Sequence, residues 1–241
     1  MKTIVVIQAR MGSSRLPGKI LKPLGNHAVL TYVVERSKKI YGVSDVIVAT
    51  SNLKQDDVVE EWCKANGILI YRGSEEDVLD RYIQAAKAFR PDYVIRVTAD
   101  CPFVDYELGS KMVKAMAEAP ADFIRIEGNL PRGLAIELFS YQTLKYIHEH
   151  GKELRHREHV TYYAYEFQDQ FSWTSVAADP TIQEPQLRIT LDTDEDYELC
   201  KRVAEQFKGD LFVSAEEVVR YLKANPDVAK INAHIEQKPV V

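Results

Sequence analysis

The N-terminal half of the chain alternates short apolar runs with amphipathic segments, and this alternation restricts the fold more than any other feature. The runs lie at residues 4–7, 45–50, 68–71 and 93–98. Between them, apolar residues recur at helical spacing, which predicts helices over 30–40, 55–65 and 78–89. Strands and helices in this order predict a parallel, doubly wound sheet with right-handed crossovers. Ligands of such sheets bind outside the carboxyl ends of the strands, so a site is expected there.

The second half of the chain is less regular. Its patterns predict helices over 106–119, 141–150, 155–167, 195–207 and 214–223, and strands over 122–126, 135–139, 172–177 and 187–191. No linker or internal repeat divides the chain, so we expect one domain over residues 1–241. The irregular stretch from about 128 to 180 is interpreted as an inserted subdomain.

A cationic loop follows the first apolar run. It holds Arg10, Arg15 and Lys19 together with Gly12 and Gly18. Glycine allows backbone N–H groups to approach a phosphate closely, and arginine and lysine supply the countercharge. The loop therefore indicates a phosphate site, although an ordinary solvated loop after a strand is the alternative.

Carboxylates follow two of the later strands. Asp100 comes after the run at 93–98, and Asp192 comes after the predicted strand at 187–191. Carboxylates of this kind suit Mg²⁺, which takes one or two of them and leaves room for water and substrate phosphates. Turn or helix-capping aspartates are the alternative, and we assign Glu195 and Asp196 that helix-terminal role. Facing the cationic loop, Asp100 and Asp192 suggest a Mg²⁺–nucleotide site.

Composition excludes several classes of protein. The net charge of −5 and the isoelectric point near 5.7 argue against non-specific binding of nucleic acid or of a membrane surface. Cys63, Cys101 and Cys200 are widely separated and have no metal-binding spacing, as in a reduced cytosolic protein. No signal peptide and no membrane span are predicted, so we expect a cytoplasmic protein.

The remaining candidate features favour structural roles. Histidines at 148, 150, 156 and 159 lie on polar predicted helices and are interpreted as solvated rather than as zinc ligands. The aromatic residues between 162 and 173 are interpreted as core or subunit contacts. The sequence has no nucleophile elbow, no dinucleotide fingerprint and no GK[ST] ending to its cationic loop.

With these residues identified, the chain resembles the cytidylyltransferases of the CMP-KDO synthetase type, and most closely their spore coat polysaccharide biosynthesis protein F branch. The R-x-x-x-x-R-L-P-x-K loop and the D-x-P motif at Asp100 are typical of sugar nucleotidyltransferases. The DVLDRY segment at 77–82 and the REHVT segment at 157–161 indicate the spore coat branch. Further matches lie at residues 7–10, 73–74 and 192–193.

The resemblance implies a nucleotide-diphospho-sugar transferase-like (Rossmann-like) three-layer sandwich with a mixed, mostly parallel sheet. It implies CTP as the donor, a sugar or sugar-phosphate acceptor, and Mg²⁺ held by Asp100 and Asp192. An acceptor oxygen would attack the α-phosphorus and expel pyrophosphate, yielding an activated sugar for surface or spore coat polysaccharide. A homodimer formed through the inserted subdomain is also implied.

The resemblance also assigns roles to individual residues. Arg15, Lys19 and Asp100 form the expected catalytic set. The nucleotide-binding set comprises Ala9, Arg10, Gly12, Ser14, Arg15, Lys19, Ser74 and Arg81. Such transfer needs positioning and charge neutralisation rather than a covalent nucleophile, which agrees with the absence of a nucleophile motif.

Two departures from the family pattern leave alternatives open. Ala135 stands where relatives often carry aspartate, and Tyr163 stands where proline is frequent. One alternative is a GT-A-type glycosyltransferase that uses Asp192, Thr193 and Asp194 as a metal-binding D-x-D motif. Another, motivated by Ala135, is a non-catalytic nucleotide-binding module.

Overall fold

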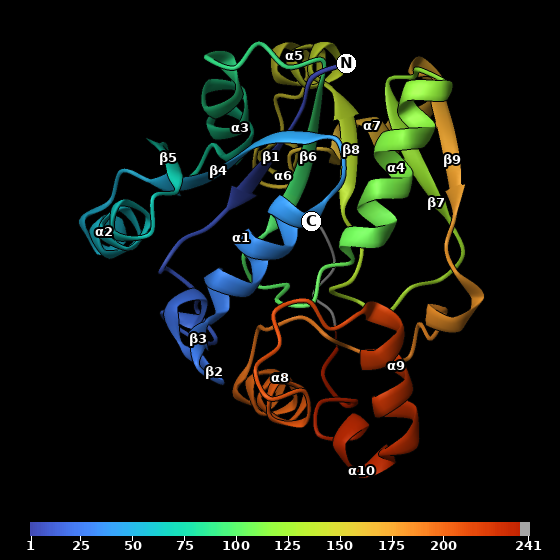
Figure 1. Ribbon diagram of the computed structural model, residues 1–241. Coiled ribbons are helices and arrows are strands. Elements are labelled where there is room, and N and C mark those ends of the chain that lie inside the picture. The colour runs from blue at the N-terminus through green and yellow to red at the C-terminus, as the bar shows by residue number, and fades with distance from the viewer. Residues whose placement is uncertain (237–241) are drawn as a thin grey trace.

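Seven strands form one twisted sheet at the centre of the protein (Figure 1). The structure is a computed structural model and describes residues 1–236. The strand order is β5-β4-β1-β6-β8-β7-β9. The strand bounds are β1 Thr3–Gln8, β4 Val43–Ser51, β5 Leu69–Gly73, β6 Tyr93–Thr98, β7 Phe123–Glu127, β8 Glu137–Ser140 and β9 Trp173–Ala177. A separate hairpin pairs β2 (Pro23–Leu24) with β3 (His27–Ala28).

The four strands predicted in the N-terminal half are confirmed, and they pair in parallel. In the register of β1, Val5 lies opposite Val46 of β4 and Ile95 of β6. Strand β8 runs antiparallel to β6 and β7, whereas β9 runs parallel to β7. The sheet is therefore mixed and mostly parallel, as expected.

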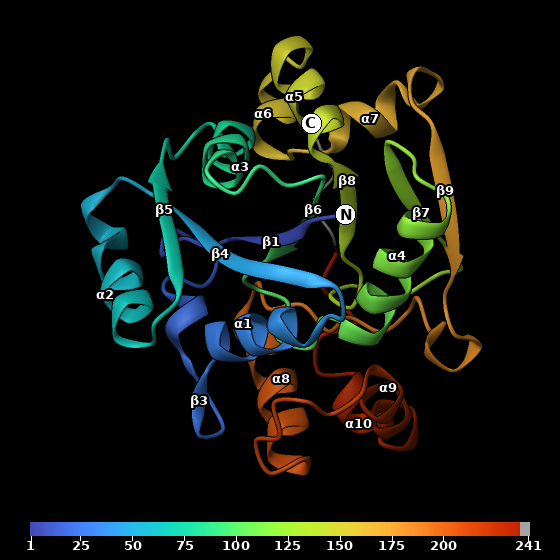
Figure 2. The ribbon, with the colours of Figure 1, turned by 45° about the horizontal axis from the view of Figure 1, so that its top comes forward.

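Helices cover both faces of the sheet (Figure 2). The longer helices are α1 Val29–Lys39, α2 Asp57–Ala65, α3 Val78–Lys87, α4 Tyr106–Glu118, α5 Tyr141–His150, α8 Asp194–Gln206 and α9 Ala215–Ala224. The shorter ones are α6 Leu154–Glu158, α7 Tyr162–Glu166 and α10 Pro226–Ala229. Alternate residues of β1 bury against opposite layers, because successive strand side chains point to opposite faces. Val5 and Ile7 pack with α1, α2 and α4, whereas Ile4 and Val6 pack with α3, α5 and α7.

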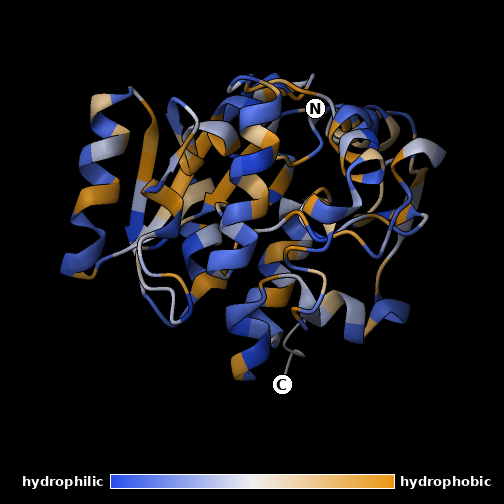
Figure 3. Cartoon of the chain, turned by 90° about the horizontal axis from the view of Figure 1, so that it is seen from below, coloured by the Kyte–Doolittle hydropathy of each residue, from blue (hydrophilic) through white to orange (hydrophobic). Residues whose placement is uncertain are grey.

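A third apolar cluster lies outside the two faces of the sheet, where α8 and α9 pack against the N-terminal part of α1. Figure 3 shows hydrophobic residues concentrated on the central strands, while the outer helices carry long hydrophilic stretches. The fully buried Arg36 of α1 links the segment before α4 to the segment between α8 and α9, since it donates to the carbonyl oxygens of Val104 (2.8 Å), Leu211 (2.9 Å) and Val213 (2.8 Å). Burial lowers the pKa of Arg36 to about 10, so the side chain stays charged at neutral pH.

The predicted strand at 187–191 is wrong. Its backbone is extended but bonds to two different segments, so it forms no ladder: Ile189 N–H donates to Arg132 (2.7 Å) and Leu191 N–H donates to Asp100 (2.9 Å). The strand-like alternation is nevertheless real, because Ile189 and Leu191 are fully buried in the third cluster. Gly133, with φ +101°, permits the close approach, since a Cβ there would lie 2.6 Å from the Ile189 carbonyl group.

The predicted helix at 155–167 is also wrong, because it is broken into α6 and α7. Val160 between them has φ 51° and a fully buried side chain. The next residue, Thr161, donates its hydroxyl to Glu137 at 2.9 Å. Burial of Val160 and this contact to β8 hold the turn against the local preference for a continuous helix.

The segment 128–180 contributes β8 and β9 to the main sheet and α5 to α7 to one of its faces. Its role as a dimerisation or acceptor subdomain stays a prediction. Ala135 is exposed, and Tyr163 is buried among other aromatic rings.

No helix within residues 1–236 combines the length and the apolar character that crossing a membrane requires.

Candidate active site

The cationic loop leaves the carboxyl end of β1 and folds back on itself. The carbonyl oxygen of Met11 accepts from the N–H groups of Ser13 (2.9 Å) and Gly18 (3.0 Å). Gly18 adopts φ 70°, a left-handed conformation that glycine takes without strain, and it leads into the 3₁₀ turn η1 (Lys19–Leu21). Met11 N–H donates to the fully buried Asp56 at 2.6 Å. The loop is thus fixed at both ends, and it directs Lys19 inward.

Lys19 joins the two predicted carboxylates. Its Nζ lies 2.7 Å from Asp100 Oδ2 and 2.8 Å from Asp192 Oδ1, and the residue is only 9% exposed. Burial lowers the pKa of Lys19, but the two carboxylates outweigh that effect and raise the pKa above its ordinary value. The ammonium is therefore charged at neutral pH, and it links a carboxylate from the middle of the chain to one from its C-terminal part.

Asp100 is placed by the strand before it and the segment beside it. It follows β6, and its carbonyl oxygen accepts from Leu191 N–H (2.9 Å) and Thr190 Oγ1 (3.3 Å). These bonds bring the end of the 187–191 segment to the carboxyl edge of β6. Asp192 therefore reaches the same place as Asp100, although it does not follow a strand of the sheet.

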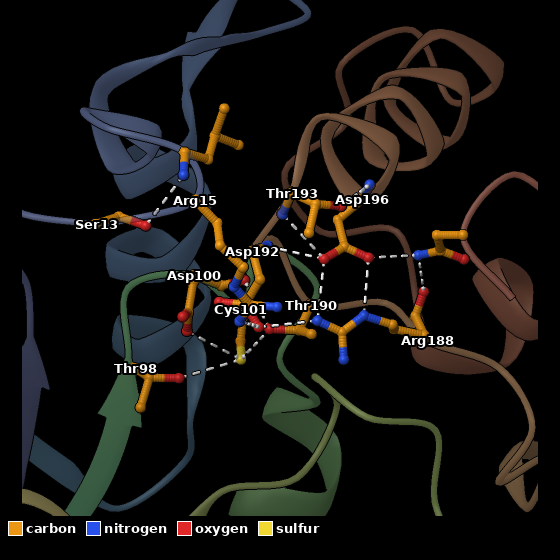
Figure 4. Close-up of polar contacts among 12 residues, drawn as sticks. Ser13, Arg15, Thr98, Asp100, Cys101, Arg188, Thr190, Asp192, Thr193 and Asp196 are labelled. Carbon is orange, nitrogen blue, oxygen red and sulfur yellow. Dashed lines mark hydrogen bonds and ion pairs between the residues drawn. The ribbon is translucent and has the colours of Figure 1, made fainter. Parts of the chain in front are cut away.

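Asp192 is the most heavily paired carboxylate of the site (Figure 4). Besides Lys19, it contacts Arg15 at 3.2 Å and Arg188 at 2.8 Å through its Oδ2. Burial raises the pKa of Asp192, but the three cations outweigh it and hold the pKa below its ordinary value. Asp194, by contrast, is exposed as the first residue of α8. The second carboxylate of the D-x-D alternative is therefore exposed rather than part of the ion pairs with Lys19.

Sequence reasoning missed the residues behind Asp192. Arg188 is paired with Asp196 through Nε–Oδ1 (2.8 Å) and Nη2–Oδ2 (3.0 Å), and Asn232 donates to Asp196 at 2.7 Å. Asp196 does have the helix-terminal role assigned to it, since it forms a capping box with Thr193. One signal in the sequence could have revealed Arg188. In an extended segment every second side chain points to the same side, so Arg188 and Asp192 share a side while the apolar residues between them alternate with it.

Arg10 and Arg81 lie near a second acidic group rather than near Asp100. Arg10 pairs with Glu75 at 2.8 Å. Arg81 is 1% exposed, and its Nε and Nη1 have no hydrogen-bond partner among residues 1–236. Burial lowers the pKa of Arg81, which the nearby Glu75 partly offsets. Gly73 makes room for this arginine, because a Cβ there would lie 2.8 Å from Arg81 Cγ.

The other predicted nucleotide-binding residues line the same loops. Ala9 is buried and its N–H donates to Ala49 at 3.1 Å, so it anchors the loop to β4. Gly12 lies against Gln55, whose amide nitrogen would be 2.8 Å from an added Cβ. Ser14 and Ser74 are exposed, and Ser74 Oγ accepts from Asp77 N–H at 3.2 Å.

The residues at Lys19 fit the Mg²⁺ that the fold family implies. Asp100 and Asp192 each direct a carboxylate oxygen at the same ammonium, and oxygen ligands are those that Mg²⁺ prefers, so these two residues would hold the ion. No group of three or more His, Cys, Asp or Glu side chains suited to a metal occurs within residues 1–236. Substrate phosphates and water would therefore complete the coordination.

The prediction that the four histidines are solvated is wrong for His156, which is only 2% exposed and meets a carboxylate. His148 lies 3.0 Å from Asp80, and His156 lies 2.7 Å from Glu166. Burial lowers the pKa of His159, which the nearby Glu158 and Glu137 partly offset. These residues belong to α5, α6 and the turn after α6, on the face of the sheet that α3 covers.

The strand order and the site at the carboxyl edge of the sheet define the class, a nucleotidyltransferase with the nucleotide-diphospho-sugar transferase fold. The same fold occurs in a CMP-KDO synthetase solved with CTP, at TM-score 0.67 and 18% identity, covering 86% of this chain and 100% of that one. The family model described as Cytidylyltransferase matches residues 4–221. The chain belongs to this cytidylyltransferase family.

Individual relatives agree with that assignment. The chain is 37% identical over 231 residues to spore coat polysaccharide biosynthesis protein SpsF of Bacillus subtilis, covering 94% of this chain and 96% of the relative. It is 31% identical over 186 residues to a 3-deoxy-manno-octulosonate cytidylyltransferase of Anaeromyxobacter dehalogenans, covering 70% and 76%. A solved cytidylyltransferase from Leptospira borgpetersenii matches with TM-score 0.88 at 31% identity, covering 99% and 100%.

Proposed function

We propose that the protein transfers the cytidylyl group of CTP to a sugar or sugar-phosphate acceptor, with Mg²⁺ as cofactor, and so activates the sugar for polysaccharide synthesis. The observation that carries this proposal is the position of Lys19 between Asp100 and Asp192. A metal-bound triphosphate needs carboxylates for the metal and a cation for the phosphates. The Lys19 ammonium and the two carboxylates beside it supply both. The names of the relatives support a sugar as the acceptor and polysaccharide synthesis as the purpose of the reaction.

In the proposed reaction, an oxygen of the acceptor attacks the α-phosphorus of CTP. A new P–O bond forms, the bond from the α-phosphorus to the bridging oxygen breaks, and pyrophosphate leaves with that electron pair. A hydroxyl acceptor gives a CMP-sugar and releases its proton, whereas a phosphate acceptor gives a CDP-sugar. No covalent enzyme intermediate is required.

The residues of the chain supply position and charge. Lys19 and Arg15 move from the carboxylates to the triphosphate and neutralise the charge that develops on the leaving pyrophosphate. Asp100 and Asp192 would hold Mg²⁺, which supplies Lewis-acid polarisation of the phosphate oxygens when bound. We assign Arg10 and Arg81 to the nucleoside end of the site, because Arg81 Nε and Nη1 have no hydrogen-bond partner within residues 1–236 and could donate to an acceptor on the ligand.

We also propose a homodimer. The segment 128–180 exposes a set of large apolar side chains, namely Leu154 (86%), Trp173 (48%), Tyr165 (41%), Tyr146 (39%) and Phe167 (37%). Strand β9, which begins at Trp173, is an edge of the sheet. A second copy would cover both features.

Light scattering at micromolar concentration is expected to give twice the mass of the chain. Leu154→Asp should shift the measured mass toward that of a monomer, while Leu53→Asp should not. A monomeric wild-type protein would rule the dimer out.

Cytoplasmic location is part of the same proposal. Cys63, Cys101 and Cys200 are all free and buried. Free thiols are typical of reducing compartments, where CTP is also available.

The catalytic proposal is tested by incubating the protein with CTP, Mg²⁺ and a panel of sugars and sugar phosphates while measuring pyrophosphate. We expect release that depends on one class of acceptor and that Lys19→Ala and Asp100→Ala abolish. Release that survives both substitutions would refute the assigned site. Tight CTP binding without turnover on any acceptor would instead support a nucleotide-binding module.

A further inference from the structure

Asn232 is buried although it lies in the C-terminal segment beyond α10. It is 1% exposed, and its Nδ2 donates both to Asp196 Oδ1 at 2.7 Å and to the carbonyl oxygen of Arg188 at 3.0 Å. Asp196 is itself fully buried. A residue 36 positions further along the chain therefore completes the surroundings of this carboxylate.

Asp196 in turn holds Asp192 at its backbone. Asp196 Oδ2 accepts from the N–H groups of Asp192 (2.9 Å) and Thr193 (3.2 Å) and from Arg188 Nη2 (3.0 Å). The same Arg188 nitrogen lies 2.8 Å from Asp192 Oδ2. Asp192 is thus fixed twice, at its main chain through Asp196 and at its side chain through Arg188 (Figure 4).

The chemistry of the position explains why an amide stands there. Both neighbours of Asn232 Nδ2, the Asp196 carboxylate and the Arg188 carbonyl, are acceptors, so the nitrogen must face them. An aspartate would place a second carboxylate against Asp196, and a leucine of similar shape would donate nothing. Asn232 Oδ1 has no hydrogen-bond partner among residues 1–236.

Stability alone would not favour this arrangement. A buried amide oxygen without a partner costs free energy, and a buried ion pair is often replaceable by apolar residues without loss of stability. The network converges instead on one functional carboxylate. Partners of this kind fix the orientation of metal ligands, and their loss typically costs 10–100-fold in metal affinity or activity.

We propose that Asn232 is a positioning residue of the active site, which acts through Asp196 and Arg188 to hold Asp192 in its metal-binding orientation. This inference rests on the proposed function, because it assumes that Asp192 binds the metal of the CTP complex. It makes the C-terminal segment part of the site, beyond the stretch at 4–221 that the family model matches.

The test uses Asn232→Leu and Asn232→Ala in the full chain. The matched control is Asn225→Ala, which removes an amide of the same C-terminal region that donates to Tyr221 O (2.8 Å) and not to Asp196 or Arg188 within the described residues. Water proton relaxation with Mn²⁺ and CTP, without acceptor, reports the ternary complex independently of turnover. We expect both Asn232 variants to need about 10–100-fold more Mn²⁺ than wild type, and Asn225→Ala to behave as wild type.

A purely structural role predicts a different pattern, in which the melting temperature falls while the Mn²⁺ requirement of the folded variants stays that of wild type. That result, in either folded Asn232 variant, would overturn the inference. If the wild-type protein itself formed no ternary complex with Mn²⁺ and CTP, the proposed function would fail. If wild type forms the complex and the variants need no more Mn²⁺ than wild type does, the inference about Asn232 is wrong while the proposed function stands.

Discussion

Lys19 Nζ lies 2.7 Å from Asp100 Oδ2, across 81 residues of sequence. The ammonium also contacts Asp192, at 2.8 Å, so it pairs with both carboxylates that would hold Mg²⁺ in the proposed complex. In that proposed complex, metal and ammonium would compete for the same oxygens. We infer that the nucleotide, by drawing Lys19 onto its phosphates, frees the carboxylates for the metal.

This competition gives a prediction for metal binding without nucleotide. Lys19→Met keeps the length of the side chain but removes the competing charge, so Mn²⁺ affinity in the absence of CTP should rise by about tenfold or more, equivalent to about 1.4 kcal/mol. Electron paramagnetic resonance of free Mn²⁺ measures it. Lys22→Met, whose cation lies over the ring of Tyr197, is the control and should leave the affinity unchanged. Equal affinities in all three proteins would argue against the competition.

Asp192 and Asp194 are distinguished by a pair of substitutions. Asp192→Asn removes the carboxylate that contacts Lys19, and we expect pyrophosphate release to fall by about 10²–10³-fold. Asp194→Asn changes an exposed residue at the start of α8 and should retain activity within about twofold. Steady-state rates at saturating CTP and Mg²⁺ decide. A large loss in Asp194→Asn would restore the D-x-D interpretation.

Gly133 is predicted to be essential for placing the 187–191 segment. Alanine there would adopt an unfavourable φ of +101° and would bring its Cβ within 2.6 Å of the Ile189 carbonyl. We expect Gly133→Ala to lower the free energy of unfolding by at least about 2 kcal/mol. Gly67→Ala is the control, since it shares a positive φ of +65° but meets no atom within 4 Å, and should cost about 1 kcal/mol. Urea titration measures both, and equal costs would contradict the close approach.

The buried thiol of Cys63 predicts a loss of stability at alkaline pH. Burial, with a smaller effect of Glu60, raises its pKa to about 12 from an ordinary 9.0. Because the folded state favours the neutral thiol, its contribution is complete below pH 9.0 and is lost as the pH rises toward 12. Between pH 9 and 10.5 the wild-type protein should lose about 2 kcal/mol more than Cys63→Ala. Urea titration measures the free energy of unfolding of both proteins across this pH range. If the two free energies fall in parallel, the prediction is wrong.

The N-terminal half of the fold follows from local sequence. The runs that became β1, β4 and β6 are apolar because both faces of those strands are covered, and apolar runs separated by amphipathic helices allow few other folds. Strand ends then place the cationic loop and Asp100 at the same edge. These features needed no knowledge of distant contacts.

Features that depend on distant contacts were not predictable. The 187–191 segment has strand-like alternation but bonds to Arg132 and Asp100, which its own sequence does not reveal. The helix expected at 155–167 breaks at Val160, a residue with no local signal for a positive φ. Asn232 has no motif at all, and only the folded chain shows that it meets Asp196.

The central claim is that Lys19, Asp100 and Asp192 form the site of a metal-bound triphosphate. The most direct measurement is calorimetric titration of CTP into wild type and Lys19→Met, each with and without Mg²⁺. We predict binding to wild type that Mg²⁺ strengthens and that Lys19→Met weakens by about tenfold or more. Binding of CTP that is indifferent both to Mg²⁺ and to the substitution would contradict the account.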